Sequence, residues 1–135
     1  MKTIFLSWYD GFLEKTGKQL YSFLETSEVN IITSPYSPHC GKGNDEKWEN
    51  WYDNGLPEAV KQSDIFIAFI SKQYDSTWMA QEFQTAFNWY LEHKSPKLFV
   101  FNPEKLKLPK GFEPYIKSSV ELPRDLSKLI RCIGI

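Results

Sequence analysis

The sequence predicts a single α/β domain in which helices cover both faces of a five-stranded parallel sheet, with the flavodoxin-like strand order 2-1-3-4-5. Short apolar runs alternate with helical segments along the 135 residues, which is the pattern of strand–helix–strand units. The run over residues 65–70 is continuously apolar, as expected for a central parallel strand buried on both faces. A chain of this length suits one domain, which we assign to residues 1–135.

Each expected element rests on a local pattern of side chains. The expected strands are short and mostly apolar, at residues 2–7, 29–33, 64–71, 97–101 and, at one edge, 119–122. The expected helices are residues 12–25, 46–62, 77–94 and 124–132. Gly55 and Pro57 are expected to break the second helix into two pieces. Helix 77–94 has the clearest core stripe, formed by Met79, Phe83, Ala86, Phe87, Tyr90 and Leu91.

Charge and hydropathy argue against several functional classes. Sixteen basic and seventeen acidic residues give a net charge of -1, without the basic surplus of a nucleic-acid-binding protein. The longest apolar run is too short to span a bilayer, and the N-terminus lacks the apolar stretch of a signal peptide. We therefore expect a cytoplasmic protein with no membrane partner, in which Cys40 and Cys132 are reduced thiols.

Aromatic residues are more numerous than a core of this size requires. The chain has ten Phe, seven Tyr and five Trp, and some of them are expected to line a pocket or an interface. In open parallel sheets, ligands bind outside the carboxyl ends of the strands. The candidate segments are therefore residues 7–11, 34–45, 71–76 and 102–109.

Glu82 is the first candidate for a functional residue. It falls in the second turn of helix 77–94, and Trp78 lies one turn earlier on the same side. A carboxylate accepts hydrogen bonds from two ribose hydroxyls, and an indole stacks on a flat ring, so this pair suits a nucleotide. The alternative is a solvated Glu and a half-buried Trp on an ordinary amphipathic helix.

The segment after the first strand offers a second set of candidates. Ser7 and Asp10 are suited to cap the next helix or to bind polar groups of a ligand. Trp8 and Tyr9 are unusual in a tight strand-to-helix loop unless they cover something. The alternative is a helix cap and two packing aromatics.

Other chemistries find little support. His39 and Cys40 are adjacent in sequence and have no evident third group, so they do not make a convincing catalytic dyad. The two His and two Cys lack the spacing of a zinc site, and no metal is expected. Gly41 and Gly43 do not complete a phosphate-binding motif. His93 is expected to complement the dipole at a helix C-terminus.

Three segments carry a resemblance to a known family. Residues 4–10 form a strand that ends in Ser and an aromatic residue, and Trp48 followed by residues 56–64 leads into the third strand. The most specific segment, residues 67–83, has a Ser at the strand end, a Tyr three residues on, and a Trp four residues before a Glu, namely Ser71, Tyr74, Trp78 and Glu82. Together these segments resemble a TIR (Toll/interleukin-1 receptor) domain, from residue 1 to about residue 101.

The resemblance implies an enzyme that cleaves NAD⁺ as a substrate, with no cofactor. In enzymatic TIR domains the Glu at the position of Glu82 is catalytic, and the Trp at the position of Trp78 lies near the substrate. We expect the rest of the substrate site to consist of Ser7, Trp8, Tyr9 and Asp10 as its floor and Ser71 and Tyr74 as its rim. Release of nicotinamide would give ADP-ribose, or a cyclic ADP-ribose isomer if a group of the same molecule captures the ribosyl cation.

The resemblance also suggests a biological setting. The chain is similar to single-domain bacterial TIR proteins, several of which act in anti-phage defence of the Thoeris kind by making a nucleotide signal for a separate effector. Self-assembly with other TIR domains is the implied partnership. The loop at residues 34–45 lacks the Arg-Asp and Pro-Gly residues common in signalling receptors, so its Tyr36 and His39 are candidates for gating or assembly. The family's third box is absent.

Two rival functions remain open at this point. A non-enzymatic TIR module that only binds other TIR domains would also use the aromatic surplus. An enzyme similar to the nucleoside 2-deoxyribosyltransferases would use Glu82 as a covalent nucleophile.

Overall fold

The computed structural model describes residues 1–8, 15–33, 54–70, 78–108, 112 and 125–134. Within these residues, four parallel strands form one sheet in the order β2-β1-β3-β4. Their bounds are β1 Lys2–Ser7, β2 Val29–Ile32, β3 Ile65–Phe69 and β4 Lys97–Phe101. The protein is therefore an α/β domain with a parallel sheet, and the expected strand at 119–122 lies outside the described residues.

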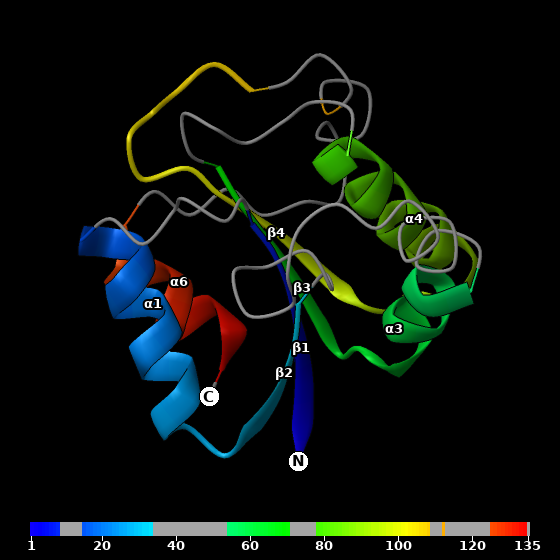
Figure 1. Cartoon of the computed structure of the whole chain (residues 1–135), viewed down its shortest axis with the longest axis horizontal. Coiled ribbons are helices and arrows are strands. Elements are labelled where there is room, and N and C mark those ends of the chain that lie inside the picture. The colour runs from blue at the N-terminus through cyan, green and yellow to red at the C-terminus, as the bar shows by residue number, and fades with distance from the viewer. Residues whose placement is uncertain (9–14, 34–53, 71–77, 109–111, 113–124, 135) are drawn as a thin grey trace, which may run out of the picture.

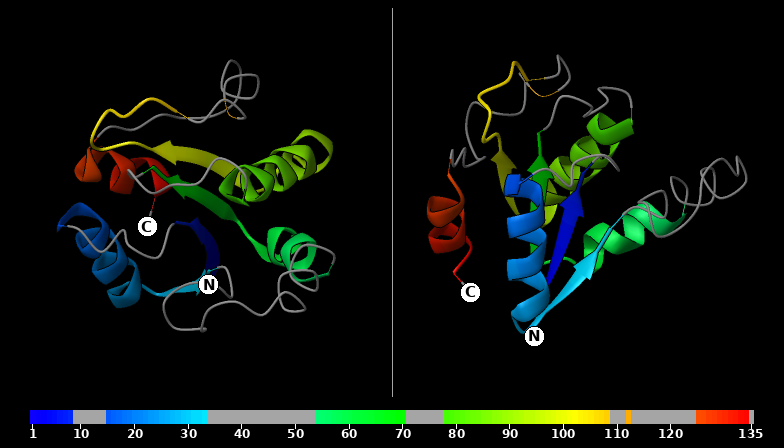
Figure 2. Two further views of the ribbon diagram at one scale, coloured as in Figure 1. Left: turned by 45° about the horizontal axis from the view of Figure 1, so that its top comes forward. Right: turned by 60° about the vertical axis from the view of Figure 1, so that its left-hand side comes forward.

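Helices cover both faces of the sheet (Figure 1). In the described part of the chain they are α1 Lys15–Thr26, α3 Leu56–Gln62, α4 Trp78–His93 and α6 Leu126–Ile133. Figures 1 and 2 show α1 and α6 together on one side of the sheet, and α3 and α4 together on the other. None of these helices is long and apolar enough to cross a membrane.

Two hydrophobic clusters hold the layers together, one on each face. Alternate residues of each strand point to opposite faces, so Phe5 belongs to the cluster under α3 and α4, whereas Ile4 and Leu6 belong to the cluster under α1 and α6. All five residues of β3 are buried, which confirms the prediction of a central strand.

Within the described residues, the predicted elements agree with the structure except in a few places, and the expected helical residues 12–14 and 46–53 lie outside them. Leu91 was expected in the core stripe of its helix, but this is wrong: the side chain is 53% exposed. The last helix begins at Leu126 rather than at 124, because the Asp125 carboxylate accepts a hydrogen bond from the Lys128 N–H and caps the helix. Pro57 lies in the first turn of α3, where its missing N–H costs no helical hydrogen bond.

Asp64 ties three strands together at the amino end of the sheet. Its carboxylate accepts a 2.8 Å hydrogen bond from the Thr3 N–H, and its own N–H donates to the Thr3 carbonyl oxygen at 2.8 Å. Its carbonyl oxygen accepts from the Lys97 N–H at 3.0 Å. The residue therefore fixes the register of β1, β3 and β4 at one point.

Replacing Asp64 with alanine is expected to lower the free energy of unfolding by about 1 kcal/mol, since one hydrogen bond of the side chain is lost while both backbone bonds remain. Urea unfolding followed by circular dichroism measures this change. Asp64→Asn keeps an acceptor oxygen and should lose less. Equal losses in the two variants would contradict the assigned hydrogen bond.

The topology also fixes the edge at which function is expected. All four strands point the same way, and α4 begins on the side towards which the strand tips point (Figure 2, right). The carboxyl ends of β1 and β3 and the first turns of α4 therefore meet at one edge of the sheet.

Candidate functional site

Ser7 is the last residue of β1 and lies at the carboxyl edge of the sheet. Its side chain is on the face covered by α3 and α4, because it is two residues from Phe5 in a strand. It is paired in register with Ala68 of β3, which has only a methyl group on that face. Ser7 is 0% exposed, so its hydroxyl group needs a polar partner inside the protein.

Glu82 provides that partner. The Ser7 hydroxyl donates a hydrogen bond of 2.8 Å to Oε1 of Glu82, which lies in the second turn of α4 and 75 positions away in sequence. Glu82 is 3% exposed, in a helix that otherwise keeps most of its polar side chains outside. The structure therefore brings together two residues that the sequence singled out separately.

A buried carboxylate is costly for a fold and needs polar partners. Glu82 is only 3% exposed, so it is not the solvated Glu of the alternative interpretation. The side chain of Trp78, the other half of that alternative, lies outside the described residues. Its neighbour Phe83 is fully buried in the core beneath α4. The carboxylate thus lies between the apolar core and the carboxyl edge of the sheet. In open parallel α/β sheets, ligands usually bind at this edge.

Trp8 lies on the opposite side of the sheet from Glu82. Its indole is 3% exposed and stacks on the ring of Tyr21 in α1, with 5.5 Å between ring centroids. It belongs to the hydrophobic cluster under α1 and α6. The structure therefore does not bring Trp8 to the carboxylate, although the two residues were predicted to share a pocket.

The remaining predicted site residues are placed only in part. Trp78 is the first residue of α4, one turn before Glu82, as expected from the helical spacing. The others lie outside the described residues, namely Tyr9, Asp10, Tyr36, His39, Ser71 and Tyr74. Residues 9–10 and 71–77 directly follow β1 and β3 in sequence.

The chemistry available at Glu82 is that of a hydrogen-bond acceptor and a negative charge. A carboxylate has about four acceptor sites, and the bond from Ser7 uses one of them. Among the described residues, no three His, Cys, Asp or Glu side chains gather in a way that would hold a metal ion. The arrangement suits a ligand that offers hydroxyl donors or develops positive charge.

A second polar feature lies further along α4 and was not predicted from the sequence. A groove of about 230 Å³ runs between α3 and α4. Within it, the Lys61 amine is 5.3 Å from the centroid of the Trp89 ring, at the distance of a cation–π contact. The full lining is Pro57, Val60, Lys61, Thr85, Asn88, Trp89 and Glu92.

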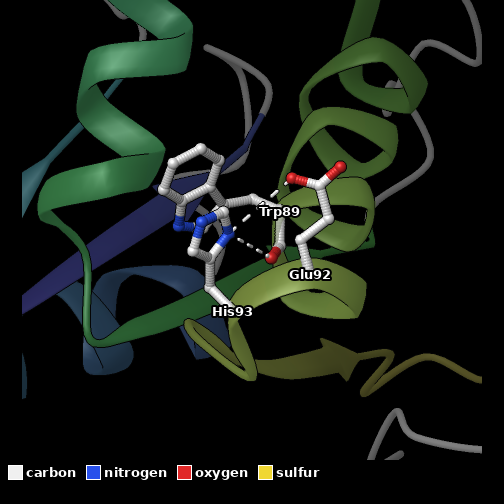
Figure 3. A network of polar contacts seen from close by, with 3 residues as sticks. All are labelled: Trp89, Glu92 and His93. Carbon is white, nitrogen blue, oxygen red and sulfur yellow. Dashed lines mark hydrogen bonds and ion pairs between the residues drawn. The ribbon is translucent and has the colours of Figure 1, made fainter.

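His93 is the last residue of α4 and packs on Trp89, one of the residues that line the groove (Figure 3). Its imidazole stacks on the Trp89 indole with 3.7 Å between centroids, its Nδ1 is 3.2 Å from the Trp89 carbonyl oxygen, and the Glu92 carboxylate is 4.0 Å away. The histidine thus lies in the last turn, as predicted for a residue that complements the helix dipole. The four-residue spacing of Trp89 and His93 is visible in the sequence, whereas the contact with Lys61 depends on how two helices pack.

Comparison with protein-family models, with curated proteins and with solved structures gives no match for this chain.

Proposed function

We propose that the chain is a TIR-like enzyme that cleaves NAD⁺ and releases nicotinamide. The proposal includes the flavodoxin-like order 2-1-3-4-5, with a fifth strand beyond β4. It rests on the sequence resemblance and on one structural observation, the buried Ser7–Glu82 pair at the carboxyl edge of a parallel sheet. A carboxylate in this position serves stability poorly, since apolar side chains would fill the space at lower cost.

The proposed chemistry needs only a fixed negative charge. The bond between the ribose C1′ and the nicotinamide nitrogen breaks, and its electron pair leaves with the pyridine ring, which becomes neutral. Positive charge then develops on the ribose as an oxocarbenium-like centre. Glu82 accepts hydrogen bonds from the ribose hydroxyls and stabilises this charge in a site with little water.

The product depends on what captures the ribosyl cation. Addition of water and loss of a proton give ADP-ribose, and attack by a nitrogen or hydroxyl group of the same molecule gives a cyclic isomer. In the proposed setting the product is a signal in bacterial anti-phage defence of the Thoeris kind. A separate cytoplasmic effector would then read this nucleotide.

Access to Glu82 is part of the proposal. The carboxylate is 3% exposed in the single chain, so NAD⁺ reaches it only when atoms that cover it move. Assembly with other copies of the domain is the event that we propose for this change, with Trp78, Tyr9, Asp10, Ser71 and Tyr74 at the completed site and Tyr36 and His39 in the assembling loop.

Nicotinamide release should therefore rise more steeply than in proportion to protein concentration. The measurement is the initial rate per chain over a hundredfold range of purified protein, with nicotinamide determined by chromatography. A constant rate per chain would contradict assembly but not cleavage. Absence of nicotinamide at every concentration, also in the presence of a crowding agent that promotes assembly, would contradict the enzymatic function.

A non-enzymatic TIR interaction module is the second candidate. The half-buried Trp89 in an open groove favours it, because aromatic side chains are enriched at interfaces. Concentration-dependent assembly that Trp89→Ala abolishes, without any turnover of NAD⁺, would support this module.

The third candidate, a deoxyribosyltransferase-like enzyme, would form a glycosyl ester on Glu82 that mass spectrometry detects after incubation with a deoxynucleoside.

A further inference from the structure

We infer that Ser7 is a positioning residue, which orients the Glu82 carboxylate through the hydrogen bond between them rather than binding the substrate. The inference rests on the proposed cleavage of NAD⁺ and deepens it. It changes the role expected for Ser7, which the sequence suggested as part of the pocket floor.

The geometry favours this role because the donor is rigid. Ser7 is held by the sheet on its β3 side, and a single side-chain torsion sets the place of its oxygen. Glu82 has three side-chain torsions, so its carboxylate has many orientations unless a partner selects one. The 2.8 Å distance is typical of an O–H···O hydrogen bond, and both residues are buried, where such a bond is stronger than in water.

The direction of the hydrogen bond follows from chemistry. An ionised carboxylate only accepts hydrogen bonds, so the proton of the Ser7 hydroxyl points to Oε1 of Glu82. That proton is therefore not available to a substrate. The hydrogen bond then holds the carboxylate in one orientation, which is the preorganisation that electrostatic catalysis requires.

A purely structural role is the competing explanation, and the chain contains a matched control for it. Ser63 is also a buried serine, 3% exposed, and its hydroxyl donates a 2.7 Å hydrogen bond to the Ala59 carbonyl oxygen. It lies just before β3, at the amino edge of the sheet and away from Glu82. Ser63→Ala removes a buried hydroxyl and one hydrogen bond without touching the proposed site.

The test compares steady-state kinetics of NAD⁺ cleavage in wild type, Ser7→Ala and Ser63→Ala. Both variants are expected to lower Tm by about 4 °C, as for the loss of one hydrogen bond in a small domain. Only Ser7→Ala should lower kcat, by about 10- to 100-fold, which is the range for a small displacement of a catalytic group. KM should change less than kcat, because Ser7 does not touch the substrate.

Ser7→Cys separates packing from hydrogen bonding. A thiol is larger than a hydroxyl but fills the same position, and it is only a weak donor. This variant should recover part of the Tm lost in Ser7→Ala while its kcat stays low. Recovery of kcat with the thiol would contradict positioning by a hydrogen bond.

The contact itself is tested without any activity. In a Glu82→Met background the Ser7 hydroxyl has lost its acceptor on residue 82, so Ser7→Ala should lower Tm less there than in wild type. An equal loss of Tm in the two backgrounds would show that the pair is not coupled and would overturn the inference.

The outcomes separate the two proposals. If wild type releases nicotinamide and Ser7→Ala behaves like Ser63→Ala, the inference fails and the proposed function stands. A rise in KM without a fall in kcat would restore Ser7 to a substrate contact and also overturn the inference. If wild type releases no nicotinamide at any concentration, both fail, whatever the Tm values show about the contact.

Discussion

Glu82→Gln is expected to reduce nicotinamide release by about 10²- to 10³-fold, the usual effect of removing one charge-stabilising group from an active site. The variant keeps the length and shape of the side chain and still offers an oxygen to the Ser7 hydroxyl. What it removes is the negative charge that opposes the positive charge on the ribose. The kcat should therefore fall much more than KM rises, as measured by product formation at saturating and low NAD⁺.

The same substitution should leave the fold intact or make it more stable. Glu82 is 3% exposed, so its charge is desolvated in the folded chain and solvated in the unfolded one. A neutral amide avoids much of this cost, and an unchanged or higher Tm is expected. Lost activity in a fully folded variant would show that the carboxylate serves function at some expense of stability. Undiminished cleavage would contradict the mechanism.

Phe83→Ala is expected to lower the free energy of unfolding by about 3–5 kcal/mol, the usual cost of truncating a buried Phe. Phe83 is 0% exposed, and its ring lies 4.4 Å from that of Phe112, 6.1 Å from that of Phe66 and 6.3 Å from that of Phe87, all between centroids. Removing it opens a cavity in the middle of the cluster between α4 and the sheet. Urea unfolding at 25 °C measures the loss.

Leu91→Ala is the matched control on the same helix. Leu91 is 53% exposed and is expected to change the free energy of unfolding by less than about 0.5 kcal/mol. Because small domains are stable by only about 5–15 kcal/mol, the Phe83 variant would be partly unfolded under conditions that leave the Leu91 variant intact. Similar losses in both variants would contradict the placement of α4 against the sheet.

The fold was predictable wherever a single local pattern decides an element. The strands at 2–7 and 97–101 were predicted with the bounds that the structure has, because short apolar runs between polar ends have few alternatives. The core position of Leu91 was wrong, since helical periodicity alone does not show where a stripe ends.

The candidate site was predictable in its residues but not in its contacts. Topology places the end of β1 and the start of α4 at one edge, so Ser7 and Glu82 were each identified from the sequence. The bond between them joins positions 75 apart, and no local pattern encodes it. Trp8 shows the reverse: it adjoins Ser7 in sequence, yet strand alternation turns it to the opposite face, against Tyr21.

Mass spectrometry of the products formed from NAD⁺ by purified wild type, with Glu82→Ala as the control, tests the central claim most directly. The account predicts equal amounts of nicotinamide and of ADP-ribose or its cyclic isomer from the wild type, and neither product above background from the variant. Intact NAD⁺ with an assembled, folded wild type would contradict the claim, and so would the same products in the same amounts from both proteins.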